Sequence, residues 1–589
     1  MKYLKFSLFF LITILFTTDC DDLLTKKDYE NKQEIINLVA FSKLYGYIKF
    51  FHPSNEASKI DWNKFGILGS QKVLNCQNNK ELIDSLKQLF YPIAHNISIY
   101  SSEEKPDKAA NKNNSALMYW QHLGVEIKDS SSFFGKSPYK SKRIKSDYVT
   151  SKLFDYKPSY GEIIKKEIIP GIYCYIPLTL HKDYKFKKSN SIEKFKILQQ
   201  QINLITDSIS VDNKFVRVAD ILITWNYVQH FYPYFEVVKV DWEEILFETL
   251  ASALQDKSRD EFLTTLQKMM AYLNDGHAIT KDLLAKYGRL PIKVDLVENQ
   301  VIATYSEDTT EFKIGDILLE INEKNIQDIL LKNENLISGS RQWKKNRALE
   351  KICIGHQGSK VKIKLIRDKD TLTIYSLRDH NKYLILDKPK FMELGHKIVY
   401  VNLNTISIDE INYKLDKILK AKGVIFDLRV YPNRNHEILC YLIGNKKVSK
   451  KWMKIPQIIY PDHKNFHFEE KGWNLKPRYP QLKGEIVFIT SSRAISYAES
   501  VLGFVKGYNL GEIVGQPTAG ANGNGVSFFL PGKFEVWFTG MKVVKHDGSQ
   551  LHMIGIKPTV YAERTIEGVR SGKDEFLEKA VEILTEKLN

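Results

Sequence analysis

The chain has 589 residues, more than one hydrophobic core usually organises, so three or four domains are expected. Its composition, with 43% hydrophobic and 12% aromatic residues, argues against a disordered protein. The formal net charge is +16, but the lysines are scattered along the chain instead of forming one stripe, which argues against a nucleic-acid-binding protein.

The first twenty residues have the pattern of an export signal. Lys2 and Lys5 precede an apolar run over residues 6–16 that is too short to span a bilayer comfortably, and small or polar residues follow up to Cys20. A cleaved secretion signal and a lipoprotein signal that attaches lipid to Cys20 fit this segment equally well. Both predict an exported protein that is periplasmic, attached to the outer membrane or extracellular.

The remaining cysteines predict no metal site. They are Cys76, Cys174, Cys353 and Cys440, and none of them has the CxxC spacing of a zinc site or redox centre. One disulfide is compatible with this pattern, and a dense disulfide framework is not. Neither a metal nor another cofactor is expected.

An internal repeat organises the N-terminal part of the chain. The aromatic segment 44–53 is echoed by 224–233, and Asp61-Trp62 is echoed by Asp241-Trp242, with an offset of 180 positions in both cases (44 to 224, 61 to 241). In each copy an aromatic-rich helix ends at a proline and a second helix begins near the Asp-Trp pair. We therefore predict a duplicated helical unit, with its first copy over residues 21–90 and its second over residues 191–289.

Strand-like segments follow each copy. Residues 91–190 carry many turn formers and one clear strand run over 168–178, which predicts a β-rich module. Residues 290–380 have a pattern of short strands only. Within them, Gly315-Asp316 forms a turn before an apolar strand that ends at Asn322, which is similar to the pattern of PDZ domains. Because PDZ domains bind peptides along a sheet edge, Gly315 and Asp316 are candidate peptide-binding residues.

From residue 385 to residue 589 the pattern alternates between strands and helices, which favours an α/β sheet with helical crossovers. Strands are expected over 397–403, 423–428 and 484–490, and helices over 408–420, 435–443 and 573–588. The fold class predicted for the whole chain is multidomain α+β. It comprises the duplicated N-terminal helical unit with a β-rich insert, the PDZ-like β module and the C-terminal α/β core.

The most informative segment of this core follows the strand over 484–490. Ser496 directly precedes an expected helix, so its side chain lies at the sheet edge and the first-turn N–H groups face any developing negative charge. A serine nucleophile requires this arrangement. The alternative interpretation is that Ser496 caps the helix, with Glu499 completing a capping box.

Four segments in a fixed order resemble the tail-specific, C-terminal processing serine proteases and their tricorn-like branch. After the PDZ-like module they are Gly423–Arg429, Ser496–Glu499, the glycine-rich turn Gly515–Gly520, and Gly555–Pro558. The resemblance covers residues 271–580. It implies an α/β protease core, hydrolysis of peptide bonds in a peptide or unfolded protein substrate, and Ser496 as the nucleophile.

The resemblance also indicates which base activates the serine. Many members of the family pair the serine with a lysine in the glycine-rich turn, but Ala521 occupies that place here. The tricorn-like branch instead carries a histidine just before its PDZ segment, in a context that matches His277. Histidine can accept the serine proton near neutral pH and return it to the leaving amine.

The third catalytic residue stays open at this stage. In the tricorn-like branch an acid lies close to the position that His552 occupies here, and the nearest acidic residue is Asp547. Glu499 and Asp275 are the alternatives. His546 and His552 are a weak signal for a metal site, because no further ligand accompanies them.

The resemblance implies two backbone donors for the oxyanion. One is the N–H of Tyr497, next to the nucleophile. The other lies in the loop after Arg429, where the family prefers three glycines and this chain has none. Pro432 has no N–H, so Val430 or Tyr431 is the expected donor. Asp427 and Arg429 are predicted to be a structural pair.

Two functions remain open. The first is an exported serine endopeptidase that works through Ser496 and His277. The second is a catalytically silent relative that keeps the fold to bind peptides or proteins. The presence of Ser496, Glu499 and His277 favours the first, and the altered loop after Arg429 favours the second.

Overall fold

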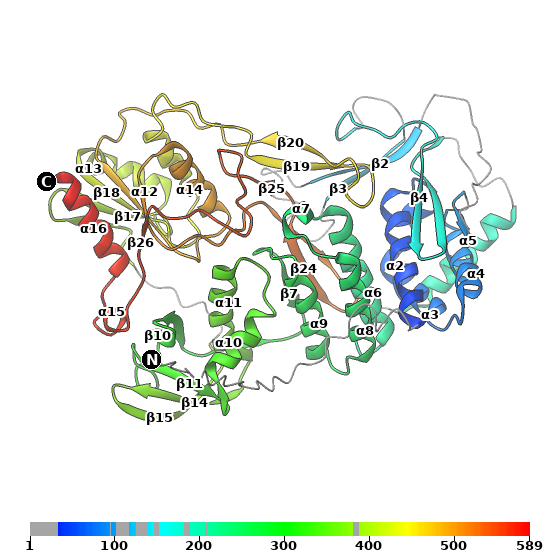
Figure 1. Ribbon diagram of the computed structural model, residues 1–589, viewed down its shortest axis with the longest axis horizontal. Coiled ribbons are helices and arrows are strands. Elements are labelled where there is room, and N and C mark those ends of the chain that lie inside the picture. Colours follow the sequence, from blue (N-terminus) through cyan, green and yellow to red (C-terminus); the bar gives the residue numbers. More distant parts are fainter. Residues whose placement is uncertain are drawn as a thin grey trace, which may run out of the picture.

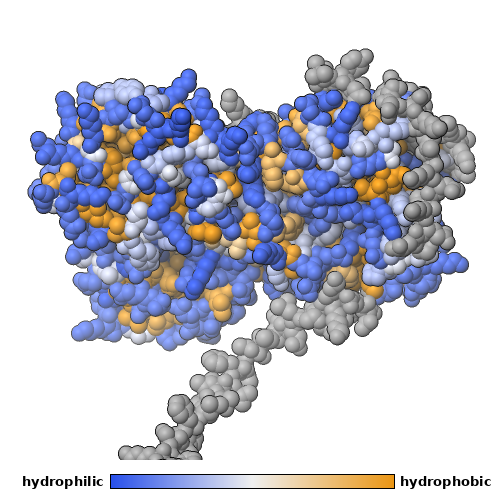
Figure 2. Space-filling model, turned by 45° about the horizontal axis from the view of Figure 1, so that its top comes forward, coloured by the Kyte–Doolittle hydropathy of each residue, from blue (hydrophilic) through white to orange (hydrophobic). Residues whose placement is uncertain are grey.

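The computed structural model describes residues 33–94, 96–101, 117–124, 139–145, 152–181, 189–206, 209–380 and 388–589. The predicted export signal and Cys20 lie outside these residues. No helix in the described ranges is long and apolar enough to cross a membrane. The face of the molecule in Figure 2 is mostly hydrophilic, with apolar residues in small scattered groups, as is usual for the surface of a folded protein.

Two helical regions pack against each other (Figure 1). The first contains α2 (Gln33–Phe51), η1 (Ala57–Lys59), α3 (Trp62–Val73) and α4 (Asn79–Phe90), and the second contains α5 (Ser189–Asn203), α6 (Lys214–Phe231), α7 (Phe235–Val238), α8 (Trp242–Gln255) and α9 (Arg259–Ala271). Their helices begin in the same way. Asp61 caps α3 through the N–H groups of residues 63 and 64, and Asp241 caps α8 through those of residues 243 and 244. Such caps satisfy N–H groups that the helix itself leaves unpaired.

Each helical region lies beside a three-stranded antiparallel sheet. The first sheet has the order β1 (Ser98–Tyr100), β5 (Ile172–Pro177), β4 (Ile163–Ile169), and the second has the order β7 (Ile279–Asp282), β24 (Phe534–Thr539), β23 (Gly525–Phe529). In both sheets the strand that follows the last helix of the region pairs with a hairpin from farther along the chain. The second sheet therefore connects the residues after α9 to the C-terminal part of the protein.

Two predictions for residues 91–190 were wrong. The run over 168–178 is not one strand, because the chain turns at Pro170-Gly171, where Gly171 has a φ of +80° and Pro170 has no N–H to give to a ladder. The strands of this segment also do not form one module. β2 (Leu117–Leu123) pairs with β3 (Lys140–Ile144), β6 (Leu180–His181) and β19 (Met453–Ile458), and β19 pairs in turn with β20 (His467–Lys471) and β25 (Lys542–Val543). This sheet connects β2 and β3 to the C-terminal half (Figure 1).

Residues 290–380 form an antiparallel sheet with two helices. The sheet contains β9 (Ile292–Val297), β10 (Gln300–Ser306), β11 (Ile317–Ile321), β12 (Lys324–Asn325), β14 (Lys360–Arg367) and β15 (Asp370–Leu377), and β9 lies at its edge. A separate pair, β8 (Tyr287–Arg289) and β13 (Ile354–His356), lies beside it. The strand-only prediction missed α10 (Ile326–Glu334) and α11 (Arg341–Cys353). The signal was present in α11, because Ala348, Leu349, Ile352 and Cys353 have helical spacing and are buried.

The C-terminal core is the predicted α/β sheet. Its order is β16 (Phe391–Leu394), β17 (Ile398–Asn402), β18 (Gly423–Asp427), β21 (Glu485–Thr490), β22 (Glu512–Gly515), β26 (Val560–Tyr561), and all neighbours are parallel except β16 and β17. Hydrophobic residues cover both faces, with α16 (Glu575–Leu588) on one and α14 (Tyr497–Tyr508) on the other. The carboxyl ends of β17, β18, β21 and β22 therefore meet at one edge, which is where open α/β sheets bind ligands.

Three helices of this core differ from the predictions in extent. The expected helix over 408–420 is divided into α12 (Ile408–Tyr413) and α13 (Leu415–Lys420), the expected helix over 435–443 is the short 3-10 helix η4 (His436–Tyr441), and α15 (Ile566–Arg570) precedes α16. None of these differences moves the strand ends. The four cysteines within the described residues are all buried free thiols.

Candidate active site

Ser496 lies at a strained junction between β21 and α14. It is the N-cap of α14 and has φ +59° and ψ −111°, a backbone conformation that is rare for a residue with a side chain. Its N–H donates to the carbonyl of Ala521 (2.9 Å) and to the carboxylate of Glu499 (3.1 Å). The surroundings thus hold a half-exposed serine in a conformation that it would not adopt alone.

The buried side chain of Glu499 stabilises this junction through hydrogen bonds. It is 0% exposed and accepts four hydrogen bonds. Oε1 receives the Thr518 hydroxyl (2.6 Å) and the Gly520 N–H (2.7 Å), and Oε2 receives the N–H groups of Ser496 and Ala521. Burial raises the pKa of Glu499 to about 7, against the opposing effect of these donors. Glu499 is therefore a buried anchor and not an exposed acid.

His277 lies where the second helical region meets the second three-stranded sheet. Its Nδ1 is 3.0 Å from the Thr539 hydroxyl, and that hydroxyl lies 2.7 Å from Oδ1 of Asp275. Asp275 is 0% exposed and also accepts the N–H of Thr539 (2.6 Å) and that of His277 (3.0 Å). Its carboxylate reaches the imidazole through Thr539, since the direct separation from Nδ1 is 3.9 Å.

This network fixes the proton positions around His277. An ionised carboxylate only accepts hydrogen bonds, so the single proton of the Thr539 hydroxyl points to Asp275. The threonine oxygen then accepts the Nδ1–H of the imidazole, and Nε2 is left with its lone pair. Burial lowers the pKa of His277, although the Asp275 carboxylate opposes this shift. The neutral imidazole is therefore favoured at neutral pH, with Nε2 as a proton acceptor.

Ala521 is the residue that joins the serine and histidine segments. Its carbonyl accepts the N–H of Ser496, and a Cβ placed on Gly276 would lie 2.7 Å from the Ala521 side chain. The segment before α11 supports the same contact, because Ser338 accepts the N–H of Asp275 (2.8 Å) and Ser340 donates to the carbonyl of Ala519 (2.6 Å). The segments that carry Ser496 and His277 thus meet in one cluster around Ala521. No hydrogen bond joins the side chains of these two residues in the described structure.

Asp547 does not take part in this cluster. It lies in an exposed turn, where its carboxylate accepts the N–H (2.9 Å) and the hydroxyl (2.7 Å) of Ser549. The prediction that it orients His277 was wrong, because its carboxylate is used by its own turn. Sequence reasoning had kept Asp275 as an alternative but missed Thr539, since a single threonine in a strand carries no motif.

The histidines near the end of the chain are structural. His552 is buried, stacks on Tyr234 at a centroid distance of 3.9 Å, and has Nε2 3.2 Å from the Tyr232 hydroxyl. Burial lowers its pKa to about 4, so the imidazole is neutral near pH 7, and it does not replace the carboxylate that the resembled proteases have near this place. His546 packs against Phe504 instead. Among the described residues, no group of three or more His, Cys, Asp or Glu side chains could hold a metal ion.

The two predicted oxyanion donors differ in their availability. The N–H of Tyr497 is the first of α14 and makes no hydrogen bond with any described residue. The N–H of Val430 already donates to the side chain of Asn404 (3.1 Å). The prediction for Val430 therefore needs correction, because a substrate oxygen would have to displace this bond. Tyr431 follows it and packs its ring 5.8 Å from that of Tyr497.

Asp427 and Arg429 are the predicted structural pair. The Arg429 guanidinium contacts both oxygens of Asp427 (3.0 and 3.1 Å from Nε) and also Asp574 at the start of α16 (2.7 Å). Asp427 additionally accepts the Tyr400 hydroxyl (2.7 Å). These contacts join β17, β18 and α16, and they leave neither group available for proton transfer.

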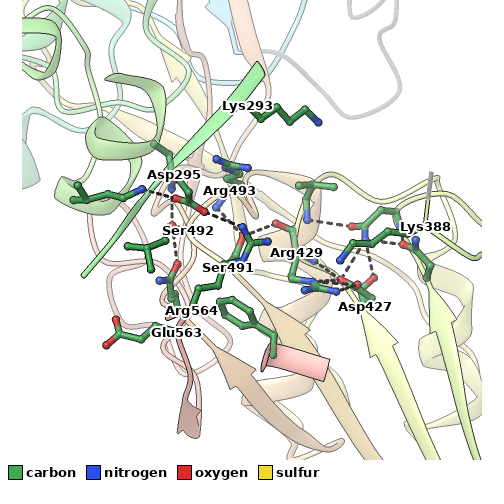
Figure 3. A pocket seen from close by; sticks show the side chains of 18 of the residues that line it. Lys293, Asp295, Lys388, Asp427, Arg429, Ser491, Ser492, Arg493, Glu563 and Arg564 are labelled. Atoms are coloured by element: carbon green, nitrogen blue, oxygen red, sulfur yellow. Dashed lines mark hydrogen bonds and ion pairs between the residues drawn. The ribbon is translucent and has the colours of Figure 1, made fainter. Parts of the chain in front are cut away.

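A pocket of about 400 Å³ opens between the edge strand β9 and the carboxyl ends of the parallel strands (Figure 3). Lys293 and residues 295–298 line one side. Asn402, Asp427, Ser491 and Gln516 line the other side, together with the loop that leads to Ser496. The pocket therefore lies between the β module and the α/β core, a few residues before the candidate nucleophile.

Gly315 and Asp316, the residues predicted to bind a peptide, do not contribute to this pocket. The Asp316 side chain is buried at 1% exposure and forms an ion pair with Arg367 (2.7 Å), and neither residue lines the pocket. Their assignment as peptide-binding residues was wrong, because the turn they form stabilises its own sheet. The β9 residues that do line the pocket carried no sequence signal beyond their strand pattern.

Comparison with known proteins agrees with this architecture. Residues 397–562 match peptidase family S41. No curated protein sequence matches the chain. Among solved structures, mature CPAF shares 14% identity with a TM-score of 0.53, over 64% of this chain and 98% of that one. The photosystem II D1 C-terminal processing protease (12%, TM-score 0.36, 63% and 97%) and the tricorn protease (15%, TM-score 0.35, 64% and 37%) are more distant in structure.

The family match contains the parallel strands, the serine junction and the turn up to β26, so it covers the part of the site that residues 397–562 contribute. The likeness to CPAF shows that the fold continues beyond this match. Residues 397–562 therefore form a domain that matches peptidase family S41, and this match supports a serine peptidase of the tail-specific, C-terminal processing type, with a fold shared with mature CPAF.

Proposed function

We propose that the protein is an exported serine endopeptidase in which Ser496 attacks the scissile carbonyl and His277 is the general base. The observation that carries this proposal is the contact at Ala521. One residue, in the place where many relatives have a lysine, receives the Ser496 N–H and also touches the glycine beside His277. In this proposal the base and the serine come from different domains.

The proposed chemistry follows from the proton positions. Nε2 of the neutral His277 takes the hydroxyl proton as Ser496 Oγ bonds to the substrate carbonyl carbon, and the resulting imidazolium returns that proton to the leaving amine. Thr539 and Asp275 stabilise the imidazolium through the Nδ1 hydrogen bond. Catalytic hydrogen bonds are often long without substrate and tighten in the complex, so the missing Ser496–His277 bond is compatible with this step.

The oxyanion formed in this step needs donors close to Ser496. The free N–H of Tyr497 and the positive end of the α14 dipole supply one such donor. Because the Val430 N–H is bound to Asn404, the N–H of Tyr431 is the second donor that we propose. A relative with only one effective donor would be slower by about 100-fold, since each oxyanion donor contributes about 3 kcal/mol.

The substrate is proposed to be an extended peptide that enters the pocket between β9 and the α/β core. As part of this proposal, residues 290–380 act as a PDZ-like module and a peptide strand pairs with the free edge of β9. Export is likewise proposed from the first twenty residues, and a lipid at Cys20 is tested by palmitate incorporation that is lost in Cys20→Ser.

A second function rests on the loop after Arg429. Its lack of glycine and the engaged Val430 N–H favour a catalytically silent relative that binds peptides. A fluorophosphonate probe separates the two functions, because it reacts only with an activated serine. Labelling of the wild type and of the exposed control Ser58→Ala, with none in Ser496→Ala, supports the peptidase. Equal labelling of all three, or of none, would support the silent relative.

A further inference from the structure

The pocket between β9 and the α/β core contains more positive charge than its own residues neutralise. Five basic residues line it: Lys293, Lys388, Arg429, Arg493 and Arg564. Three of them form ion pairs, since Arg429 binds Asp427 and Asp574, Lys388 binds Asp574, and Arg564 binds Asp295 at 3.3 Å. Two cations remain to be explained.

Lys293 and Arg493 are these two cations. Within the described residues, neither forms an ion pair, and neither ammonium nor guanidinium donates a hydrogen bond to another side chain; the Lys293 ammonium lies 6.0 Å from the centre of the Tyr305 ring. Lys293 projects from the edge strand β9, and Arg493 projects from the loop between β21 and Ser496 (Figure 3). They therefore approach the pocket from both of its walls. Both side chains are half-buried, so water screens their charges less than at the open surface.

The two cations also influence each other. Burial and, to a lesser extent, the positive charges of Arg493 and Arg289 together lower the pKa of Lys293 to about 8, while the carboxylate of Glu350 opposes this shift. Two of the acids that line the pocket form no ion pair within the described residues. Glu298 and Glu563 are exposed at the pocket mouth, where Glu298 accepts the N–H of Ile566 and Glu563 accepts the Tyr561 hydroxyl. Two neighbouring unpaired cations in a partly closed pocket are stabilised most by an anionic group placed between them.

We propose that Lys293 and Arg493 form a subsite for a carboxylate of the bound peptide. The inference rests on the proposed function, because it assigns a substrate preference to the same pocket. A guanidinium binds a carboxylate through two parallel N–H groups, and an ammonium adds a third donor without a required direction. Arg493 lies three positions before Ser496, so the subsite would fix the peptide close to the nucleophile.

Either a Glu or Asp side chain or the peptide's terminal carboxylate supplies this chemistry. Two matched peptide pairs distinguish these sources. In the first pair an internal Glu is replaced by Gln, and in the second a free C-terminal acid is replaced by the amide. Binding is measured by fluorescence anisotropy with full-length Ser496→Ala protein, so the result does not depend on turnover. A failed peptidase activity and a failed carboxylate preference are thus separate observations.

The acid member of one pair is expected to bind about tenfold more tightly than its neutral partner, as for a charged hydrogen-bonded contact. Arg493→Gln and Lys293→Gln, each in the Ser496→Ala protein, should reduce that preference to about twofold or less, while Arg493→Lys retains part of it. The exposed control Lys369→Gln should leave it unchanged. Thermal melting confirms that each variant is folded. Equal binding of acid and neutral peptides, or a preference that survives both Gln variants, would overturn the proposal.

Discussion

The two helical regions of this protein share several local features, and the candidate base His277 follows only the second. Asp61 and Asp241 cap equivalent helices, and so do Asn78 and Ser258, each pair being 180 positions apart (61 to 241, 78 to 258). In both regions an aromatic side chain donates to the carbonyl of the Trp that opens the next long helix, at 3.0 Å in the first and 2.7 Å in the second. Both regions end in a strand of a three-stranded sheet with the same order.

The difference lies in the residues at the entry to that strand. At the offset of 180 positions, His277 corresponds to Ile97, which is buried at 3% exposure. By the strand registers, Thr539 corresponds to Ile176, which is fully buried. Apolar residues thus complete the first region at places where the second has a hydrogen-bonded network. The scaffold does not require the network, so its presence in the second region points to function.

The largest expected effect on kcat comes from substituting His277, and Ile97 is the corresponding residue of the first region. His277→Ala should lower kcat about 10⁴-fold with little change in KM, because a general base acts in the transition state. Ile97→Ala is the matched change in the first region. It should cost about 3 kcal/mol of unfolding free energy through a cavity and leave the kcat of the folded protein unchanged. Steady-state kinetics and thermal melting measure both. A similar loss of kcat in the two variants would break the comparison.

A smaller loss of kcat is expected from substituting Glu499, whose buried carboxylate stabilises the junction at Ser496. In Glu499→Gln one oxygen becomes an NH₂ group, which cannot accept from the N–H groups of Ser496 and Ala521. The junction should loosen, with kcat reduced about 100-fold and stability reduced by about 2 kcal/mol. Glu512→Gln, at a partly exposed carboxylate that pairs with Lys587, is the control. Wild-type kcat in Glu499→Gln would show that the buried carboxylate does not position the nucleophile.

The smallest effect on rate is expected at Thr539, whose hydroxyl links the Asp275 carboxylate to the His277 imidazole. Thr539→Val removes the hydroxyl but keeps the backbone N–H that donates to Asp275. We expect kcat to fall about tenfold, because an orienting hydrogen bond contributes about 1 to 2 kcal/mol. Thr539→Ser keeps the hydroxyl and should retain most of the activity. If Val and Ser variants are equally active, the hydroxyl does not orient the imidazole.

Sequence patterns predicted the scaffold better than the site. Periodicity predicted the parallel strands and the helices of the two helical regions, and the Asp-Trp pairs indicated these two regions before any contact was known. The same reasoning missed α10 and α11, because the short strands on both sides of them led to the expectation of further strands in between. It also failed for β2, whose partner β19 is more than 300 positions away, since long-range pairing leaves no local signal.

The site was predictable where a residue type is chemically distinctive. Ser496 and His277 became candidates because of their local contexts and the missing lysine at Ala521. Thr539, Lys293 and Arg493 were not, because a threonine in a strand or a lysine in a lysine-rich chain is common. The hydrogen bond from the Val430 N–H to the Asn404 side chain could not be predicted from the sequence either, since it depends on how two loops meet in space.

The most direct test of the account is the rate at which a fluorophosphonate labels Ser496 from pH 5 to pH 8 in wild type and His277→Ala. A base acts when it is deprotonated, and burial lowers the pKa of His277 below its ordinary value of 6.5. The wild-type rate should therefore rise with pH, reach its midpoint below pH 6.5 and then level off, while the His277→Ala rate stays low and nearly flat. Equal rates and equal pH profiles for the two proteins would contradict the assignment of His277, and with it the functional difference between the two helical regions.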